Sequence, residues 1–92
     1  MNTNMVTGST EVREQLCRYI AEYLLFSDKK YPFEDDASFL KNGVVDSTGV
    51  MELVAYVEKK FGVTVGPKEV VPDNFDSVKN LTGYIKRKTG GN

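Results

Sequence analysis

The sequence predicts an all-α fold: a small four-helix bundle with three main helices, a short third helix and a long loop between the first two helices. Three segments repeat apolar residues at the spacing of a helix with one buried face: residues 12–24, 50–61 and 78–85. The one strand-like stretch, residues 63–65, has no second strand to pair with. A chain of 92 residues has room for one core. We therefore expect one domain over residues 9–88, with flexible tails at 1–8 and 89–92.

The first helix is expected to begin at Ser9 or Thr10, because a hydroxyl can cap free backbone amides and the neighbouring Glu11 favours the positive end of a helix. Its apolar side chains then follow helical spacing: Val12, Leu16, Tyr19, Ile20, Tyr23 and Leu24. Cys17 lies beside this stripe, with no cation or helix N-terminus expected to lower its pKa. We interpret it as a half-buried small residue and not as a reactive thiol.

Residues 27–46 show no sustained hydrophobic period and contain Pro32 and Gly43, which predicts a long connecting loop. A loop of this length is uncommon in a compact domain unless it has a function or packs by its own side chains. Six apolar residues are expected to supply that packing: Tyr31, Phe33, Phe39, Leu40, Val44 and Val45. The acidic run at residues 34–36 lacks the spacing and the turn glycine of a calcium loop, so we expect it to be solvated.

The second helix is expected from Ser47 to Phe61, with Gly62 ending it. At 100° per residue, one side collects the core-facing residues Val50, Leu53, Val54, Val57 and Phe61. The other side collects the solvent-facing residues Thr48, Met51, Glu52, Ala55 and Lys59. The core does not need the apolar groups of Met51 and Ala55, so this outer face is the predicted partner surface.

The rest of the chain is expected to be a linker, a short turn and a last helix. Residues 63–65 read as extended linker, and Pro67 to Val71 as a short helical turn. Asp76 or Ser77 is expected to cap the last helix, and Thr89 to Asn92 to fray. The inward-facing residues of this helix are Val78, Leu81 and Ile85.

The composition excludes several kinds of chemistry. The chain has no His and no Trp, so it offers no histidine base and no imidazole ligand for a metal site. A single Cys allows neither an internal disulfide nor a multi-thiolate zinc site, which fits a reducing compartment. If this protein takes part in group transfer, it must borrow its reactive group.

Charge and hydropathy narrow the expected partners and location. There are 12 Lys and Arg against 13 Asp and Glu, and positive charge gathers only at residues 86–88. There it complements the negative end of the last helix, so we expect no nucleic-acid partner. The first ten residues lack the basic region of a secretory signal, and no apolar run approaches the roughly 20 residues of a membrane span. We expect a cytoplasmic monomer with no membrane partner.

The segment from Gly43 to Thr48 delivers a serine, Ser47, to the first turn of the second helix. Unpaired amides and the positive helix end favour a phosphate at this position, and a hydroxyl there can carry one covalently. Asp46, Ser47 and Thr48 are also good N-cap residues. Spacing alone leaves two interpretations open: a serine that carries a phosphate group, and an ordinary N-cap.

From about Phe39 to Ile85 the sequence resembles the acyl and peptidyl carrier proteins, a phosphopantetheine-binding family. The resemblance rests on an ordered series of motifs: Asp46-Ser47, Glu52-Leu53-Val54, Glu58…Phe61, Val63-x-Val65 and Phe75…Val78…Leu81…Tyr84-Ile85. It implies that Ser47 is the attachment point of a covalent 4′-phosphopantetheine, transferred from coenzyme A by a separate phosphopantetheinyl transferase. Asp46 would help to position the serine or the metal of the transferase.

The resemblance also implies a discrete carrier protein, itself not an enzyme, that tethers an acyl or aminoacyl group as a thioester. The implied partners include an activating ligase and the acyl-transfer or condensing enzymes of fatty-acid or secondary-metabolite biosynthesis. The expected partner surface comprises Thr48, Met51, Glu52, Ala55, Tyr56 and Lys59.

Four residues depart from the usual fatty-acid carrier. Thr48 replaces a leucine, Gly49 stands where an acid is frequent, and Lys59 and Lys60 stand where acids tend to continue. The second helix is therefore close to neutral, and electrostatic steering towards basic partners should be weak. These departures favour a specialised set of partners and keep an aminoacyl cargo open.

Two alternatives come from other functional classes. An unmodified helical interaction module would recruit a partner through Met51, Ala55 and Tyr56. A metal-dependent or acid–base enzyme would use the carboxylates of Glu34, Asp35, Asp36 and Asp46. The enzyme is disfavoured because a chain of this size has little concave surface for a pocket.

Overall fold

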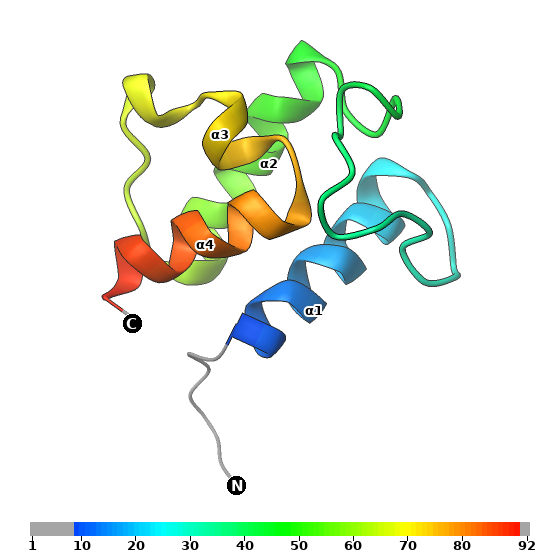
Figure 1. Cartoon of the computed structure of the whole chain (residues 1–92), viewed down its shortest axis with the longest axis horizontal. Coiled ribbons are helices and arrows are strands. Elements are labelled where there is room, and N and C mark those ends of the chain that lie inside the picture. The colour runs from blue at the N-terminus through cyan, green and yellow to red at the C-terminus, as the bar shows by residue number, and fades with distance from the viewer. Residues whose placement is uncertain (1–8, 91–92) are drawn as a thin grey trace, which may run out of the picture.

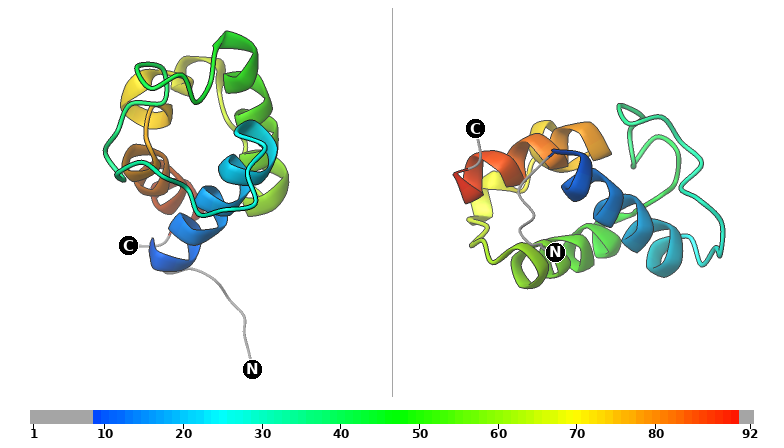
Figure 2. Two further views of the ribbon diagram at one scale, coloured as in Figure 1. Left: turned by 90° about the vertical axis from the view of Figure 1, so that its right-hand side faces the viewer. Right: turned by 90° about the horizontal axis from the view of Figure 1, so that it is seen from below.

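The computed structural model describes residues 9–90, which form helices joined by loops, with no strand in that range (Figure 1). In chain order the helices are α1 (Ser9–Tyr19), the π-helical η1 (Ile20–Leu24), α2 (Ser47–Phe61), the 3-10 turn η2 (Pro67–Glu69), α3 (Pro72–Phe75) and α4 (Val78–Thr89). Both α1 and α3 pack against α4, and Figure 2 shows the helices arranged around a common centre. The predicted all-α bundle is confirmed. Within the described residues, no helix is both long enough and apolar enough to span a bilayer.

The core draws on every main helix and on the long loop. Its completely or almost completely buried side chains are Leu16, Ile20, Phe39, Leu53, Val57, Val78, Leu81 and Ile85. Burying an aliphatic or aromatic side chain of this size contributes about 1.5–3 kcal/mol each relative to leaving it exposed. The inward-facing residues predicted for α4, Val78, Leu81 and Ile85, are therefore confirmed as part of the core that stabilises the fold.

The first helix departs from the predicted regular helix in its last turn. The Leu25 N–H donates to the Ile20 carbonyl at 2.9 Å, five residues back, as in a π-helix. The wider turn rotates the following side chains, so Tyr23, expected to face inward, is exposed. The helical segment ends at Leu24, and two residues later Phe26 has a φ of 53° and an 87% exposed side chain. Val12 and Leu16 are buried as expected.

The bounds predicted for α2 agree with the structure. Gly62 ends the helix in the left-handed conformation, with φ 69°, and its N–H donates to the Glu58 carbonyl at 3.0 Å. Leu53, Val54 and Val57 are buried, whereas the two ends of the predicted stripe, Val50 and Phe61, are half-buried.

The segment between α2 and α4 contains one helix that the sequence did not predict. Residues 63–65 are extended as expected, but the short turn ends at Glu69 and a separate α3 follows. With four residues, α3 is too short to show a helical period, and Pro72 at its first position is the only local signal. Ser77 caps α4 by accepting from the Asn80 N–H at 3.0 Å, and the helix continues to Thr89, one residue beyond its predicted end.

The long loop is attached to the bundle by Asp76, the other residue considered as a cap for α4. One carboxylate oxygen accepts from the Ser38 hydroxyl at 2.5 Å and the other from the Leu40 N–H at 3.0 Å. The Asp76 carbonyl accepts from the Phe39 N–H at 2.8 Å. These bonds fix the backbone on both sides of Phe39, so its ring enters the core.

Five of the six apolar loop residues pack as predicted. Phe39, Val44 and Val45 are buried, and Tyr31 and Phe33 are partly buried against the core. The prediction for Leu40 is wrong, because its side chain is 51% exposed. Its backbone is held by Asp76 in a turn over residues 39–43, and in this turn the Leu40 side chain faces solvent next to the buried Phe39.

The acidic run is only in part the solvated stretch that was expected. Glu34 and Asp36 are exposed. Asp35 is half-buried and pairs with Arg13 of α1, with 2.6 Å between Nε and Oδ2. The Asp35 carbonyl also accepts from the Lys79 N–H at 2.8 Å. Asp35 thus links α1, the loop and the start of α4.

Glu69 joins the linker to α4 through three donors. Its Oε1 accepts from the Gly66 N–H at 2.9 Å, the Tyr84 hydroxyl at 2.7 Å and the Lys88 ammonium at 3.1 Å. The Gly66 amide, followed by Tyr84 and Lys88, lowers the pKa of Glu69 to about 2. Burial and the hydrogen bond to Glu69 raise the pKa of Tyr84 to about 12. The ionised carboxylate is therefore the form that the fold favours.

We predict that the free energy of unfolding falls with acidification through Glu69. Because its pKa is about 2 in the folded chain against an ordinary 4.5, its contribution is complete above about pH 5 and is lost as the pH falls towards 2. Urea unfolding at a series of pH values should show a shallower acid slope for Glu69→Gln than for the wild type. The exposed Glu34→Gln is the matched control, and equal slopes for the wild type and Glu69→Gln would contradict the assignment.

Candidate functional site

Asp46 forms the N-cap of α2. Its backbone is extended, its Oδ1 accepts from the Gly49 N–H at 2.8 Å, and its carbonyl accepts from the Val50 N–H at 3.0 Å. The side chain is exposed. The capping role considered for this residue is confirmed, and the sequence predicted it because Asp is a preferred N-cap residue.

Ser47 is the first residue of α2 and its side chain is exposed. The buried Val44 and Val45 anchor the chain immediately before it, so the serine is held at the helix head and not on a free loop. The first amides of a helix have no acceptor within the helix, and its dipole is positive at this end. The hydroxyl is thus presented to solvent at the electropositive end of a 15-residue helix.

Gly49 allows the close approach of the helix head to Val45. A Cβ at this position would lie 3.2 Å from the Val45 Cβ and 3.5 Å from the Asp46 Oδ1. A side chain here would press on the buried Val45, whereas its distance from the Asp46 carboxylate would be that of an ordinary contact. The glycine therefore has a packing reason that the sequence alone did not show.

The outer face of α2 is exposed as predicted. Its exposed residues are Thr48, Met51, Glu52, Ala55, Lys59 and Lys60, and Met51 exposes 61% of its surface. Two cations, Lys59 and Lys60, stand in the last turn, and the first turn contains no acid. The face thus combines a solvent-exposed thioether with charge of both signs.

Tyr56 differs from the other residues of the expected partner surface. Its ring stacks on Tyr19 of α1, with 3.8 Å between ring centroids, and its hydroxyl donates to the Gln15 carbonyl at 3.4 Å. The side chain is half-buried, and burial raises its pKa. Most of Tyr56 is used to join α1 to α2, so any contact with a partner is limited to the exposed part of its ring.

A small apolar pocket of about 130 Å³ lies beside the first turns of α2. Val50 of α2, Leu40 of the loop and Val71 before α3 line it, and the last two expose their side chains at its rim. Sequence reasoning missed this pocket because Leu40 was expected inside the core and α3 was not predicted.

The carboxylates considered for an acid–base or metal site do not come together. Asp35 pairs with Arg13 and Asp46 caps α2. Across residues 9–90, the structure shows no group of three or more His, Cys, Asp or Glu placed to hold a metal ion. The structure gives that alternative no support.

A small helical bundle with an exposed serine at the head of its second main helix defines a class of carrier domain. Residues 14–85 match the family described as the phosphopantetheine attachment site, and the chain belongs to this family. Its prosthetic group is a covalently attached 4′-phosphopantetheine.

Two relatives extend the comparison. The chain is 26% identical over 77 residues to the D-alanyl carrier protein of Abiotrophia defectiva, covering 84% of this chain and 95% of the relative. It is 24% identical over 76 residues to the probable acyl carrier protein PigG of Serratia sp. (strain ATCC 39006), covering 83% of this chain and 86% of the relative. Both alignments span most of the domain, and both relatives are carrier proteins by name.

The residues at the head of α2 fit such a group. An exposed hydroxyl can form a phosphodiester, and the positive end of α2 favours the phosphate charge. The Asp46 carboxylate already accepts the Gly49 N–H, which directs part of its charge into the helix. Val50, which lines the apolar pocket, lies one helical turn after Ser47 in α2.

We predict that Asp46 and Ser47 differ in their effect on stability. Asp46→Ala removes the N-cap and should lower the free energy of unfolding by about 0.5–2 kcal/mol. Ser47→Ala removes an exposed hydroxyl and should change it by less than about 0.5 kcal/mol. Urea unfolding of both unmodified variants measures this, and an equal loss in the two would show that the Ser47 hydroxyl supports the fold.

Proposed function

We propose that Ser47 carries the 4′-phosphopantetheine and that the domain presents acyl or aminoacyl groups to partner enzymes. The single observation that supports this most is the exposed Ser47 at the capped head of α2 in a chain of the phosphopantetheine attachment site family. When bound, the group supplies a thiol on a flexible arm, to which cargo is joined. The proposal gives the chain a transport role in the cytoplasm and no catalytic step of its own.

The residues around Ser47 supply a position and not a base. The chain has no His, and the Asp46 carboxylate is engaged with the Gly49 N–H. A coenzyme A-dependent phosphopantetheinyl transferase would therefore supply the base, the metal and the stabilisation of the transition state. What this chain contributes is a serine already held at the surface by Val44 and Val45 on one side and α2 on the other.

The exposed face of α2 is the proposed partner surface, with Thr48, Met51 and Lys59 as its central contacts. Met51 is flexible and polarisable, and such a side chain can adapt to more than one partner. Lys59 and Lys60 add positive charge where the helix ends. A partner that docks on this end should present acidic groups to it.

The two relatives suggest two cargo classes for this chain. One is named for D-alanine and the other as an acyl carrier, so an aminoacyl group and an acyl group are both supported. The near-neutral α2 favours a dedicated ligase and a specialised biosynthetic route over general fatty-acid partners.

We expect a phosphopantetheinyl transferase with coenzyme A to add one phosphopantetheine to the wild-type chain, at Ser47. Intact mass spectrometry detects the addition, and peptide mass spectrometry locates it. Ser47→Ala should abolish the addition, whereas Thr64→Ala, which removes an exposed hydroxyl away from the proposed partner surface, should retain it. A wild-type chain that stays unmodified while a known carrier is modified in the same reaction would favour an interaction module instead.

Charge reversal of Lys59 and Lys60 to Glu should slow loading more than it affects stability. Both side chains are exposed, and the reversal loses the interaction of two cations with the negative end of α2, so the fold should lose about 0.3–1 kcal/mol per site. The rate of transferase or ligase modification, measured at low salt, is expected to fall severalfold and the difference to shrink at high salt. The double reversal of Lys41 and Lys68, also exposed, controls for net charge. Equal rates for the two double variants would place recognition elsewhere.

A further inference from the structure

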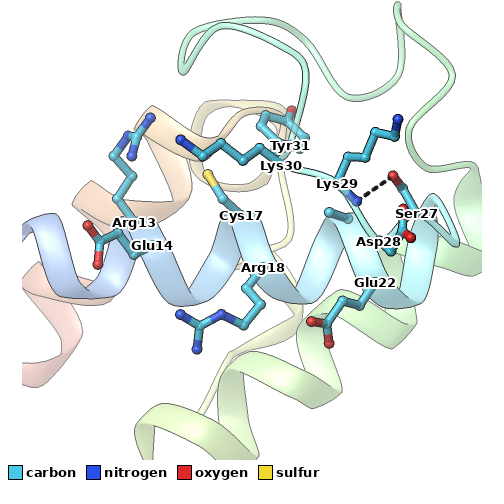
Figure 3. A pocket seen from close by; sticks show the side chains of 11 residues that line it. Arg13, Glu14, Cys17, Arg18, Glu22, Ser27, Asp28, Lys29, Lys30 and Tyr31 are labelled. Atoms are coloured by element: carbon cyan, nitrogen blue, oxygen red, sulfur yellow. Dashed lines mark hydrogen bonds between the residues drawn. The ribbon is translucent and has the colours of Figure 1, made fainter.

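The two sides of α1 differ in what they offer a ligand. A pocket of about 580 Å³ beside Cys17 lies between α1, η1 and the first residues of the long loop (Figure 3). Exposed side chains of both charge signs line this pocket, so it favours no class of ligand. On the side of α1 that faces α2, in contrast, three tyrosine rings are stacked in a row.

The tyrosine row, formed by Tyr56, Tyr19 and Tyr23, joins α2 to η1. Tyr56 of α2 stacks on Tyr19 of α1, with 3.8 Å between ring centroids and 12° between ring planes. Tyr19 stacks in turn on Tyr23 of η1, with 5.3 Å between ring centroids. Tyr56 and Tyr19 are half-buried, whereas Tyr23 is 63% exposed. The row therefore presents the open ring of Tyr23 on a base of two packed rings.

The tyrosine row adjoins the partner surface proposed on α2, because Tyr56 belongs to both. Glu52 of that surface is exposed. Burial, and after it the negative charge of Glu52, raises the pKa of Tyr19, which indicates that this carboxylate lies near the row. In the described part of the chain the one cation–π contact is Lys88 over Tyr84, so no Lys or Arg covers the three rings.

Charge is separated along the tyrosine row. Figure 3 shows the Arg18 and Glu22 side chains extending from α1 towards α2 at different points along the helix axis. Burial raises the pKa of Tyr56 and the Arg18 charge opposes this increase, so Arg18 lies near the Tyr56 end. Glu22 is next to Tyr23 in the chain, and neither Glu22 nor Glu52 forms an ion pair among the described residues. The exposed end of the row is therefore acidic and the Tyr56 end is basic.

We propose that the exposed Tyr23 ring receives an arginine side chain of the phosphopantetheinyl transferase, between the carboxylates of Glu22 and Glu52. This rests on the proposed function, in which that enzyme modifies Ser47. A guanidinium is planar and cationic, so it can stack on a tyrosine ring and donate to a carboxylate. The attachment-site family implies this enzyme before any other partner, because the group must be attached before cargo can be carried.

The same charge separation fixes the direction in which the transferase approaches. Lys59 and Lys60 follow Tyr56 in α2 and extend the basic end of the row. An enzyme with its arginine at Tyr23 and acidic groups at these lysines matches the charge at both ends. The reversed orientation would bring like charges together, which is unfavourable. The tyrosine row thus selects one orientation on α2.

The contact is tested with a phosphopantetheinyl transferase that modifies the wild-type chain, by following the addition with mass spectrometry over a series of chain concentrations. Tyr23→Ala should raise the KM for the chain about two- to fivefold, as expected for an exposed cation–π contact, and should leave kcat within about twofold. Tyr23→Phe keeps the ring and should retain the wild-type KM. Phe26→Ala is the matched control, because Phe26 is 87% exposed and stacks on no other described ring.

A second pair of variants tests the charge. Glu22→Gln should raise the KM at low salt more than Glu34→Gln, which removes an exposed acid of the loop, and the difference should shrink at high salt. Glu22 is exposed, so its variant should fold even if Tyr23→Ala disturbs the row.

The outcomes separate this inference from the proposed function. A wild-type chain that stays unmodified would contradict the proposed function, and the docking contact with it. If the wild type is modified, equal KM values for Tyr23→Ala and Phe26→Ala, or for Glu22→Gln and Glu34→Gln, would overturn the docking contact alone. A KM for Tyr23→Phe as high as that for Tyr23→Ala would also overturn it, because the hydroxyl and not the ring would then carry the contact.

Discussion

The hydrogen bonds of Asp76 hold the long loop to the bundle, and the position of the serine depends on them. Ordering a residue costs about 1–2 kcal/mol of backbone entropy, so a loop over residues 27–46 needs firm anchors. Asp76 supplies two side-chain acceptors and one carbonyl acceptor to residues 38–40. With this point fixed, Phe39 fills the core, and Val44 and Val45 can reach it again just before the head of α2.

The proposed attachment site is then a consequence of where the loop ends. The buried Val44 and Val45 hold the chain in place before the helix. Gly49 lets the helix head approach Val45, and Asp46 caps the helix through the nearby Gly49 N–H. Nothing in this arrangement requires an acid–base group, which agrees with a chain that has no His. A rigid position without acid–base groups suits the proposed role, in which the reactive group is borrowed and other proteins supply the catalysis.

The features that the sequence predicted are those determined by neighbouring residues. Both ends of α2 follow from local signals, Asp46 at its start and Gly62 at its end, and the structure matches them. The failures involve contacts between distant segments: Tyr23 turns outward through a π-helical turn, and Leu40 faces solvent because Asp76 holds its backbone. Tyr56 stacks on Tyr19, 37 positions earlier in the chain, and no spacing rule within α2 indicates that contact.

The long loop also connects the pocket beside Cys17 to Ser47 at the head of α2. Its first residues line the pocket beside Cys17, and its last residues lead into Ser47. Between these ends, Asp35 is bonded to α1 and α4, and residues 38–40 are bonded to Asp76. A ligand shifts a distant equilibrium only if it binds two arrangements of the intervening structure with different affinity. Because these attachments fix the middle of the loop by several hydrogen bonds, a change at one end of the loop should have little effect at the other. The same bonds that hold Ser47 in place at the head of α2 therefore separate it from the first residues of the loop.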